Sequence, residues 1–227
     1  MNLNQKKEKN LKINILNKQQ KHWEHKFSKR SEMFGTSPSL AAQKAVEIFK
    51  RKKFTNILEL GAGQGRDTIF FAQNGFNLQV LDYSKSGINS IIKKAKTLNL
   101  SDLISVKYHD IRKSIPFKDA TFDCCFSHML YCMAFTSAEL DLLSNNINRV
   151  LKFGGLNIYT VRHIGDADYG KGIHRGDDLY ETGGFIVHFF SKEKIKQLST
   201  GFEIVSVDSF EEGSFPRKLF RVTLRKK

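Results

Sequence analysis

An acid and three glycines stand close together in the segment NILELGAGQGRD, residues 56–67. Glu59 precedes glycines at positions 61, 63 and 65, and the apolar run before them predicts a buried strand that feeds a tight turn. The dinucleotide-binding pattern G-x-G-x-x-G places its third glycine one residue later. A carboxylate just before the first glycine would repel a pyrophosphate and attract an ammonium group. We therefore expect a nucleotide-like ligand that carries an amino acid.

Two further acids follow later predicted strands. Asp82, in the segment LDYS, is placed to accept hydrogen bonds from ribose hydroxyls, although dinucleotide-binding folds use an acid at the same place. Tyr83 beside it offers a ring face for an adenine. In the segment HDI, Asp110 could accept the exocyclic amine of the adenine, and the backbone N–H of Ile111 could reach a ring nitrogen.

Alternating strands and helices would bring these acids to one edge of a sheet. Strands are predicted at 55–60, 76–82, 103–110, 120–128, 156–163, 202–210 and 218–226, and helices at 17–30, 39–53, 66–75, 84–100, 137–152 and 191–200. This order predicts an α/β fold, a Rossmann-like doubly wound sheet of seven strands. The short connection between the last two strands predicts a C-terminal antiparallel hairpin, so six strands run parallel and one antiparallel.

Helix-capping and turn-forming residues predict the boundaries between these elements. Ser37 and Pro38 are expected at the N-cap and first position of the second helix. Gly154 and Gly155 are expected to end the helix before them, and residues 164–184 are expected to form a glycine-rich loop.

The ordered motifs ELGAGQG, LDYS, HDI, FDCCFSH and LKFGGLNIYTVR resemble the class I S-adenosylmethionine-dependent methyltransferases. The resemblance covers residues 37–227, and the segment GAGQGRDTIFFAQNGFNLQVLDYS is similar to the small-molecule branch that includes the tellurite-resistance and thiopurine enzymes. It implies S-adenosyl-L-methionine as cofactor, S-adenosyl-L-homocysteine as its product, and methyl transfer to a heteroatom of a small molecule. The site residues that it implies are Glu59, Gly61, Ala62 and Gly63 at the methionine end, Asp82 at the ribose, Tyr83, Asp110 and Ile111 at the adenine, and Ser127 near the sulfonium.

Residues for the methyl acceptor are expected at the ends of the fourth and fifth strands. His128 and His163 are the leading candidates for a general base, because histidine titrates near neutral pH, and the alternative is that they only fix loops. Tyr131 is a further catalytic candidate. The remaining candidates for acceptor contact are Cys132, Arg162, Tyr169 and His174. Arg162 would either bind an anionic acceptor or pair with a nearby aspartate.

The three cysteines give no metal site and favour a reducing, cytoplasmic compartment. Cys124 and Cys125 are expected on opposite faces of their strand. Their thiols would then point away from each other, which disfavours a shared arsenic site of the kind found in arsenite methyltransferases. They are therefore interpreted as core residues.

Residues 1–36 form a basic extension before the domain at 37–227. Its helix at 17–30 carries Trp23, and with Phe34 it is predicted to act as a lid over the ligand. The alternative is an amphipathic helix packed on the sheet. Residues 1–17 are polar and expected to be mobile.

The formal net charge of +14 leaves one rival function open. Basic residues gather at both ends, so an RNA or protein methyltransferase that docks through its termini is the first alternative, although no nucleic-acid-binding motif is recognisable. The second alternative, which does not depend on charge, is a nicotinamide-dependent oxidoreductase or a nucleotide sensor.

No apolar run is long enough to span a membrane. The acceptor and the oligomeric state are left open.

Overall fold

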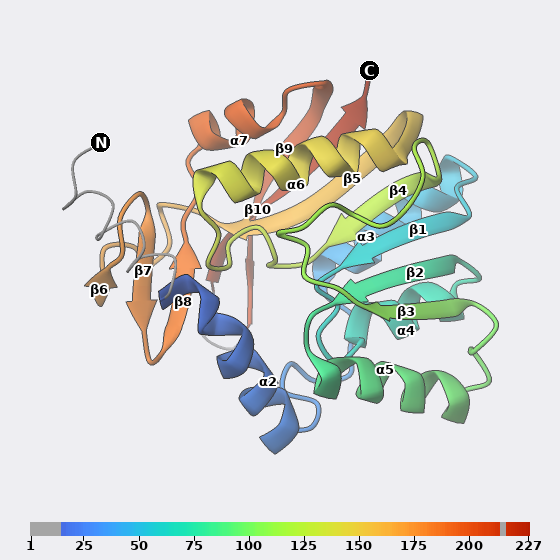
Figure 1. The fold of residues 1–227 in the computed structure, drawn as a ribbon. Coiled ribbons are helices and arrows are strands. Elements are labelled where there is room, and N and C mark those ends of the chain that lie inside the picture. Colours follow the sequence, from blue (N-terminus) through green and yellow to red (C-terminus); the bar gives the residue numbers. More distant parts are fainter. Residues whose placement is uncertain (1–14, 214–216) are drawn as a thin grey trace.

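The computed structural model describes residues 15–213 and 217–227. It contains a seven-stranded central sheet in the order β3-β2-β1-β4-β5-β10-β9 (Figure 1). The strands are β1 (Asn56–Leu60), β2 (Asn77–Asp82), β3 (Ile104–Tyr108), β4 (Phe122–Ser127), β5 (Leu151–Arg162), β9 (Phe202–Glu212) and β10 (Arg217–Lys226). Strands β1 to β5 pair in parallel, and β10 pairs antiparallel with both β5 and β9. The predicted Rossmann-like fold with its C-terminal hairpin is confirmed.

Helices cover both faces of this sheet, as a doubly wound fold requires. Apolar residues of three helices pack on one face and those of two others on the opposite face. The first group is α3 (Leu40–Arg51), α4 (Arg66–Gln73) and α5 (Lys85–Thr97), and the second is α6 (Ser137–Val150) and α7 (Lys192–Leu198). No helix in the described ranges has the length and apolar sequence needed to cross a membrane.

Alternation along β4 separates the two neighbouring cysteines. Cys124 packs in the core beneath α3, α4 and α5, and Cys125 packs in the core beneath α6 and α7. Both are fully buried with free thiols. The expected placement on opposite faces is therefore correct, and it follows from the two-residue period of a strand.

The predicted loop at 164–184 is wrong in part, because this region builds a second, smaller sheet. Strands β6 (Ile173–His174), β7 (Leu179–Thr182) and β8 (Phe185–His188) pair antiparallel. Gly183 and Gly184, with φ of 59° and 82°, form the two-residue turn between β7 and β8. Positive φ at both central residues is what a tight hairpin requires, so the Gly-Gly pair was a hairpin signal.

Two predicted helix boundaries also need correction. The N-cap of α3 is Ser39 and not Ser37, because the Ser39 hydroxyl accepts the Ala42 N–H at 3.0 Å and is itself held by Asp67. Helix α6 ends at Val150 and runs directly into β5, so Gly154 lies within the strand, where its φ is 75°.

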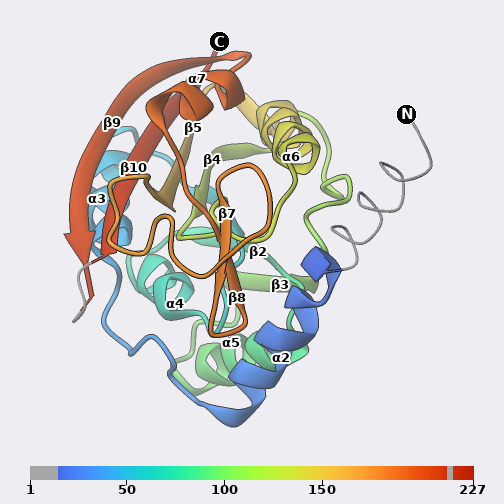
Figure 2. The same cartoon turned by 90° about the vertical axis from the view of Figure 1, so that its left-hand side faces the viewer.

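Helix α2 (Gln19–Lys29) lies outside the layers, between the small sheet and α5 (Figures 1 and 2). Gln19 links it to the small sheet: its Nε2 donates to the Gly184 carbonyl at 2.9 Å, and its Oε1 accepts the Ile186 N–H at 3.3 Å. Of the segment 1–17 that was expected to be mobile, residues 1–14 lie outside the described residues. Leu16 is buried among apolar residues of the small sheet.

Candidate functional site

A pocket opens at the carboxyl ends of β1, β2 and β3. Ligands of doubly wound sheets bind at this edge. The strand ends provide one wall, and α2 and the loop after β4 provide the other. The lining residues are Leu16, Gln19, Gln20, Gly61, Leu81, Asp82, Tyr83, His109, Asp110, Ile111, Arg112, Leu130, Met133, Ala134 and Phe135.

The glycine turn after β1 borders this pocket and is tied to β2. The N–H of Gly61 donates to a β2 carbonyl at 2.8 Å, and that of Gly63 donates to Asp82 Oδ2 at 2.8 Å. Their φ values are 66° and 55°, in the left-handed region that favours glycine. A Cβ at Gly61 would lie 2.6 Å from a Leu130 methyl, and one at Gly63 3.1 Å from the Phe27 ring. Other segments thus approach this backbone closely.

Glu59 lies beneath the turn and is almost fully buried, with 2% of its surface exposed. Its Oε2 atom is buried without a hydrogen-bond partner among the described residues. Burial raises the pKa of Glu59 to about 8, helped by the nearby charges of Asp67 and Asp82 and opposed by the neighbouring Thr68 hydroxyl. An unpaired buried carboxyl is costly to ionise, and a cation placed against it would restore its charge.

Asp82 and Tyr83 follow directly at the end of β2 and line the pocket. Each Asp82 oxygen accepts one backbone N–H at 2.8 Å, from Gly63 and from Ser84. Burial nevertheless raises the pKa of Asp82 to about 6. Because a carboxylate oxygen has two lone pairs, each oxygen can still accept a ligand hydroxyl.

Asp110 and Ile111 line the neighbouring wall. The Asp110 carboxylate is already paired with the Arg112 guanidinium, at 2.6 Å from Nη2 and 2.9 Å from Nε. Although burial opposes it, this pairing lowers the pKa of Asp110. Sequence reasoning did not single out Arg112, which fixes the carboxylate at the pocket wall.

Residues 57–155 match the protein family described as "Methyltransferase domain". This match assigns residues 57–155 to a methyltransferase domain. Its matched range contains the glycine turn and all the acids of the pocket. Among curated protein sequences, none matches the chain.

Solved structures confirm the fold of this methyltransferase domain. A S-adenosylmethionine-dependent methyltransferase from Methanosarcina mazei is 20% identical, with a TM-score of 0.63 over 75% of this chain and 92% of that one. The 1,6-didemethyltoxoflavin-N1-methyltransferase of Burkholderia thailandensis is 18% identical, with a TM-score of 0.66 over 83% and 79%. TehB from Haemophilus influenzae is 17% identical, with a TM-score of 0.65 over 90% and 67%. With the family match, they confirm the predicted resemblance to class I methyltransferases.

Ser127 is the last residue of β4, and His128 follows it at the same edge of the sheet. Ser127 is fully buried, and its hydroxyl has no partner among the described residues. His128 Nδ1 is hydrogen bonded to Thr160 Oγ1 at 3.0 Å, and its Nε2 faces Glu212 Oε2 at 3.3 Å. Burial lowers the pKa of His128, so its imidazole is neutral near pH 7.

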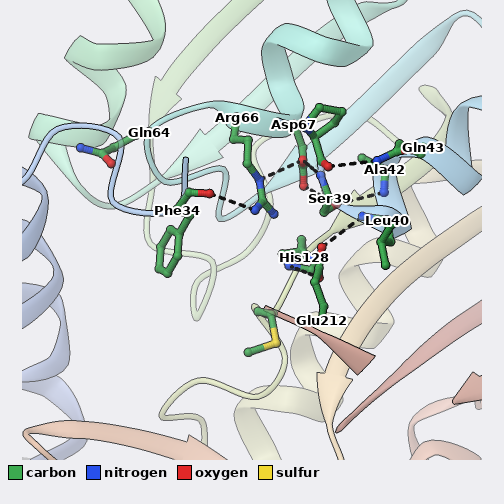
Figure 3. A network of polar contacts seen from close by, with 12 residues as sticks. Phe34, Ser39, Leu40, Ala42, Gln43, Gln64, Arg66, Asp67, His128 and Glu212 are labelled. Carbon is green, nitrogen blue, oxygen red and sulfur yellow. Dashed lines mark hydrogen bonds and ion pairs between the residues drawn. The ribbon is translucent and has the colours of Figure 1, made fainter. Parts of the chain in front are cut away.

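A polar network continues from His128 to the beginnings of α3 and α4 (Figure 3). Glu212 Oε1 accepts the Leu40 N–H at 3.1 Å. Asp67 accepts the Ser39 N–H and hydroxyl, both at 2.8 Å. Arg66 joins this network to the segment before α3, because it donates to Asp67 at 3.3 Å and to the carbonyl of residue 34 at 3.3 Å.

Tyr131 and Cys132 were expected to contact the acceptor, but the structure places both in the core. Residues 128–135 fold into turns instead of continuing the strand, and this turns both side chains inward. Tyr131 is fully buried, stacks on Tyr159 at 4.1 Å between ring centroids and accepts from Asn157. Burial raises the pKa of Cys132 to about 11, which leaves an unreactive thiol. Leu130 and its neighbours 133–135 line the pocket instead.

Arg162 and His163 do not reach the pocket either. The Arg162 guanidinium is paired with Asp166 and, at 2.7 Å, with Asp168, which agrees with the pairing alternative. His163 stacks on Phe220 at 4.3 Å, and its Nδ1 accepts the N–H of residue 165. Both side chains therefore fix the segment after β5.

Tyr169 and His174 belong to the small sheet and the loop before it. Their rings pack on Tyr180, at 5.4 Å and 5.0 Å between centroids. Tyr169 donates to Asp178, and His174 Nε2 lies 2.8 Å from the Asp177 carbonyl. Neither lines the pocket.

The predicted lid residues form an aromatic cluster above the glycine turn. Trp23 lies 5.0 Å from Phe185 of the small sheet, 5.5 Å from Phe27 and 6.2 Å from Phe34, between ring centroids. Since Phe27 also touches the turn at Gly63, α2 covers it. Gln19 and Gln20 of α2, which sequence reasoning missed, line the pocket itself. Their only sequence signal was their place on the buried side of an amphipathic helix.

Proposed function

We propose that the pocket binds S-adenosyl-L-methionine and that the protein transfers its methyl group to a heteroatom of a small molecule. The observation that carries this proposal is the unpaired, buried carboxyl oxygen of Glu59 beneath the glycine turn. A ligand with an ammonium group at that place supplies the missing partner, and a dinucleotide has no such group.

The other residues present fit the remaining parts of the cofactor. Gly61, Ala62 and Gly63 would lie along the methionine end, and the free lone pairs of Asp82 would accept the ribose hydroxyls. Tyr83, Asp110 and Ile111 would surround the adenine, and the unpartnered hydroxyl of Ser127 would lie near the sulfonium. Arg66, in the first turn of α4, would face the carboxylate of the methionine, which a helix N-terminus also favours.

The bound cofactor supplies an activated methyl group on sulfur. The task of the protein is then to align an acceptor heteroatom with that methyl group and to keep water out. Helix α2 suits the second task, because its residues wall the pocket and its aromatic side chains cover the glycine turn. We infer that α2 and Phe34 act as a lid, and that the domain itself begins near residue 37.

A small acceptor fits this covered arrangement better than a macromolecule does. The neighbour from Burkholderia thailandensis, crystallised with S-adenosylhomocysteine, acts on 1,6-didemethyltoxoflavin, a small molecule. We also propose a cytoplasmic location, since all three cysteines are buried free thiols.

The ligand is tested by titration calorimetry with S-adenosylmethionine, S-adenosylhomocysteine and NAD. We expect the first two to bind, NAD to fail, and Glu59→Gln to weaken S-adenosylmethionine binding at least tenfold. Glu193→Gln, a change at an exposed helix position, is the matched control. Wild-type affinity in the Glu59 variant would refute the assignment.

The acceptor class is tested with methyl-labelled S-adenosylmethionine and a host extract separated by size. Label among small metabolites supports the proposal, and mass spectrometry then identifies the methylated atom. Label in RNA or protein would instead favour docking through the basic termini.

A further inference from the structure

The hydrogen-bond network around His128 fixes where its ring hydrogen lies. The Met129 N–H donates to Thr160 Oγ1 at 2.8 Å and uses one of its lone pairs. The hydroxyl hydrogen of Thr160 is then available for His128 Nδ1, 3.0 Å away. In a neutral imidazole one nitrogen accepts and the other carries the hydrogen, so His128 Nε2 is the protonated nitrogen.

That nitrogen faces a carboxylate. His128 Nε2 lies 3.3 Å from Glu212 Oε2, so the hydrogen on Nε2 is on the side of the ring that faces the carboxylate. The opposite tautomer would place a bare nitrogen lone pair against the carboxylate, which is repulsive. The other charged groups near His128 are Arg66 and Asp67 from α4 and Arg217 from β10. The neutral Nε2–H tautomer thus agrees with every contact of the ring.

His128 Nδ1 is occupied by Thr160 and Nε2 carries the ring hydrogen, so neither nitrogen is free to take a proton from an acceptor. Glu212 differs. Its Oε1 accepts the Leu40 N–H and its Oε2 faces His128 Nε2, so each oxygen keeps at least one free lone pair. The side chain of Glu212 is 19% exposed, so solvent can reach it beside the end of β4.

The local backbone holds this arrangement in place. Met129, which provides the N–H to Thr160, has φ of 60°, a conformation that is rare for a residue with a Cβ. Such strain persists only where surrounding contacts enforce it. Met129 lies one residue beyond His128 and two beyond Ser127, at the end of β4 where the methyl group would be presented.

We propose that Glu212 is the group that takes the proton of the acceptor, and that His128 is a positioning residue that holds the Glu212 carboxylate. The inference rests on the proposed function and names its acceptor class, a heteroatom with an O–H, N–H or S–H hydrogen to lose. As the bond from heteroatom to methyl forms, the bond from methyl to sulfur breaks and its electron pair stays on sulfur. The proton of the acceptor moves to a free lone pair of Glu212, which returns it to solvent.

The first test needs no acceptor and observes His128 directly. In ¹⁵N-labelled protein, the side-chain resonances of His128, assigned with a His128→Asn variant, should show a hydrogen on Nε2 and an acceptor at Nδ1. Glu212→Gln should shift the Nε2–H resonance, and Glu211→Gln, the exposed neighbour on β9, should not. A hydrogen on Nδ1, or a charged imidazole at pH 7, would overturn the inference.

The second test measures transfer of labelled methyl into the small-molecule fraction. General acid–base groups contribute about 10²- to 10⁴-fold in rate. Glu212→Gln should slow transfer at least a hundredfold with S-adenosylmethionine affinity within twofold, Glu212→Asp should recover part of the rate, and Glu211→Gln should match the wild type. Wild-type transfer by Glu212→Gln would contradict only this inference. A wild type that binds no S-adenosylmethionine would contradict the proposed function itself, and the tautomer result would remain valid.

Discussion

The N–H of Gly63 donates a 2.8 Å hydrogen bond to Asp82 Oδ2 and so ties the glycine turn after β1 to the end of β2. The backbone proposed to hold the methionine end and the acid proposed to hold the ribose are thereby fixed relative to each other before a ligand binds. Groups that are already in place lose less entropy on binding. The contact depends on a left-handed backbone at residue 63.

Gly63→Ala should destabilise the fold and weaken S-adenosylmethionine binding. A residue with a Cβ loses roughly 1–2 kcal/mol in the left-handed region, and this Cβ would lie 3.1 Å from the Phe27 ring of α2. Gly75→Ala is the matched control, because Gly75 has φ of 85° and nothing within 4 Å of its Cβ position. Urea unfolding and calorimetry on both variants separate backbone strain from loss of the site. Equal affinity in the two variants would show that the turn does not contact the ligand.

The ligand-free protein should lose stability between pH 6 and pH 8. Burial raises the pKa of Glu59 from an ordinary 4.5 to about 8. A carboxyl with a folded pKa above its unfolded value binds more protons in the folded state, so its contribution is complete below the unfolded pKa and is lost as pH rises through the folded pKa. The slope is at most about 1.4 kcal/mol per pH unit. Asp82, with its pKa raised to about 6, adds a loss at lower pH.

Urea unfolding at half-unit steps from pH 5.5 to pH 8.5 measures this dependence. Glu59→Gln should remove most of the decrease above pH 6, and Glu193→Gln should leave it intact. Saturating S-adenosylmethionine should flatten the wild-type curve, because its ammonium group would pair with the ionised Glu59. Parallel curves for wild type and Glu59→Gln would show that Glu59 is already charged in the free protein.

The acids around the glycine turn and the pocket were predictable because each lies at or near the end of a strand. Glu59, Asp82 and Asp110 come at or just beyond the ends of three parallel strands, and parallel strands bring their carboxyl ends to one edge. The strands could be located from short apolar runs alone. Position along a strand therefore predicts the place of these side chains without any knowledge of tertiary contacts.

The acceptor side was less predictable because it depends on loops and on distant segments. Tyr131, just beyond the predicted strand, is expected from the sequence to contact the acceptor, whereas turns bury Tyr131 and present Leu130. Glu212 lies 84 residues beyond His128 in sequence and reaches it only because β9 ends at the same edge of the sheet. No local sequence pattern predicts the contact between His128 and Glu212. Arg162 shows the same limit, since its nearby aspartates were recognised as partners but could not be chosen over a ligand.

Glu24→Gln should loosen α2 over the pocket. The Glu24 carboxylate accepts from the Ser84 hydroxyl at 2.7 Å and the Ser86 hydroxyl at 2.6 Å, at the beginning of α5. Although burial opposes it, these hydrogen bonds lower the pKa of Glu24. Hydrogen bonds to a charged group contribute about 1.5–3 kcal/mol, so amides of α2 should exchange with deuterium about tenfold faster or more in the variant.

Glu47→Gln, a change on the exposed face of α3, is the control for that experiment. Dissociation of S-adenosylhomocysteine, followed by stopped flow, should also quicken in Glu24→Gln if α2 is a lid. Faster amide exchange without faster dissociation would instead identify α2 as a structural helix that does not gate the pocket.

Asp166→Asn should destabilise the protein by about 3 kcal/mol or more, because it leaves the Arg162 guanidinium buried with a weakened partner. The two side chains are 7% and 1% exposed. Asp168, which also pairs with Arg162, is 53% exposed, so Asp168→Asn should lower stability by less than about 1 kcal/mol. Urea unfolding compares the two variants, and the KM for the acceptor, once identified, should change little in Asp168→Asn. Unchanged stability of Asp166→Asn together with a raised KM would return Arg162 to the role of an anion-binding residue for the acceptor.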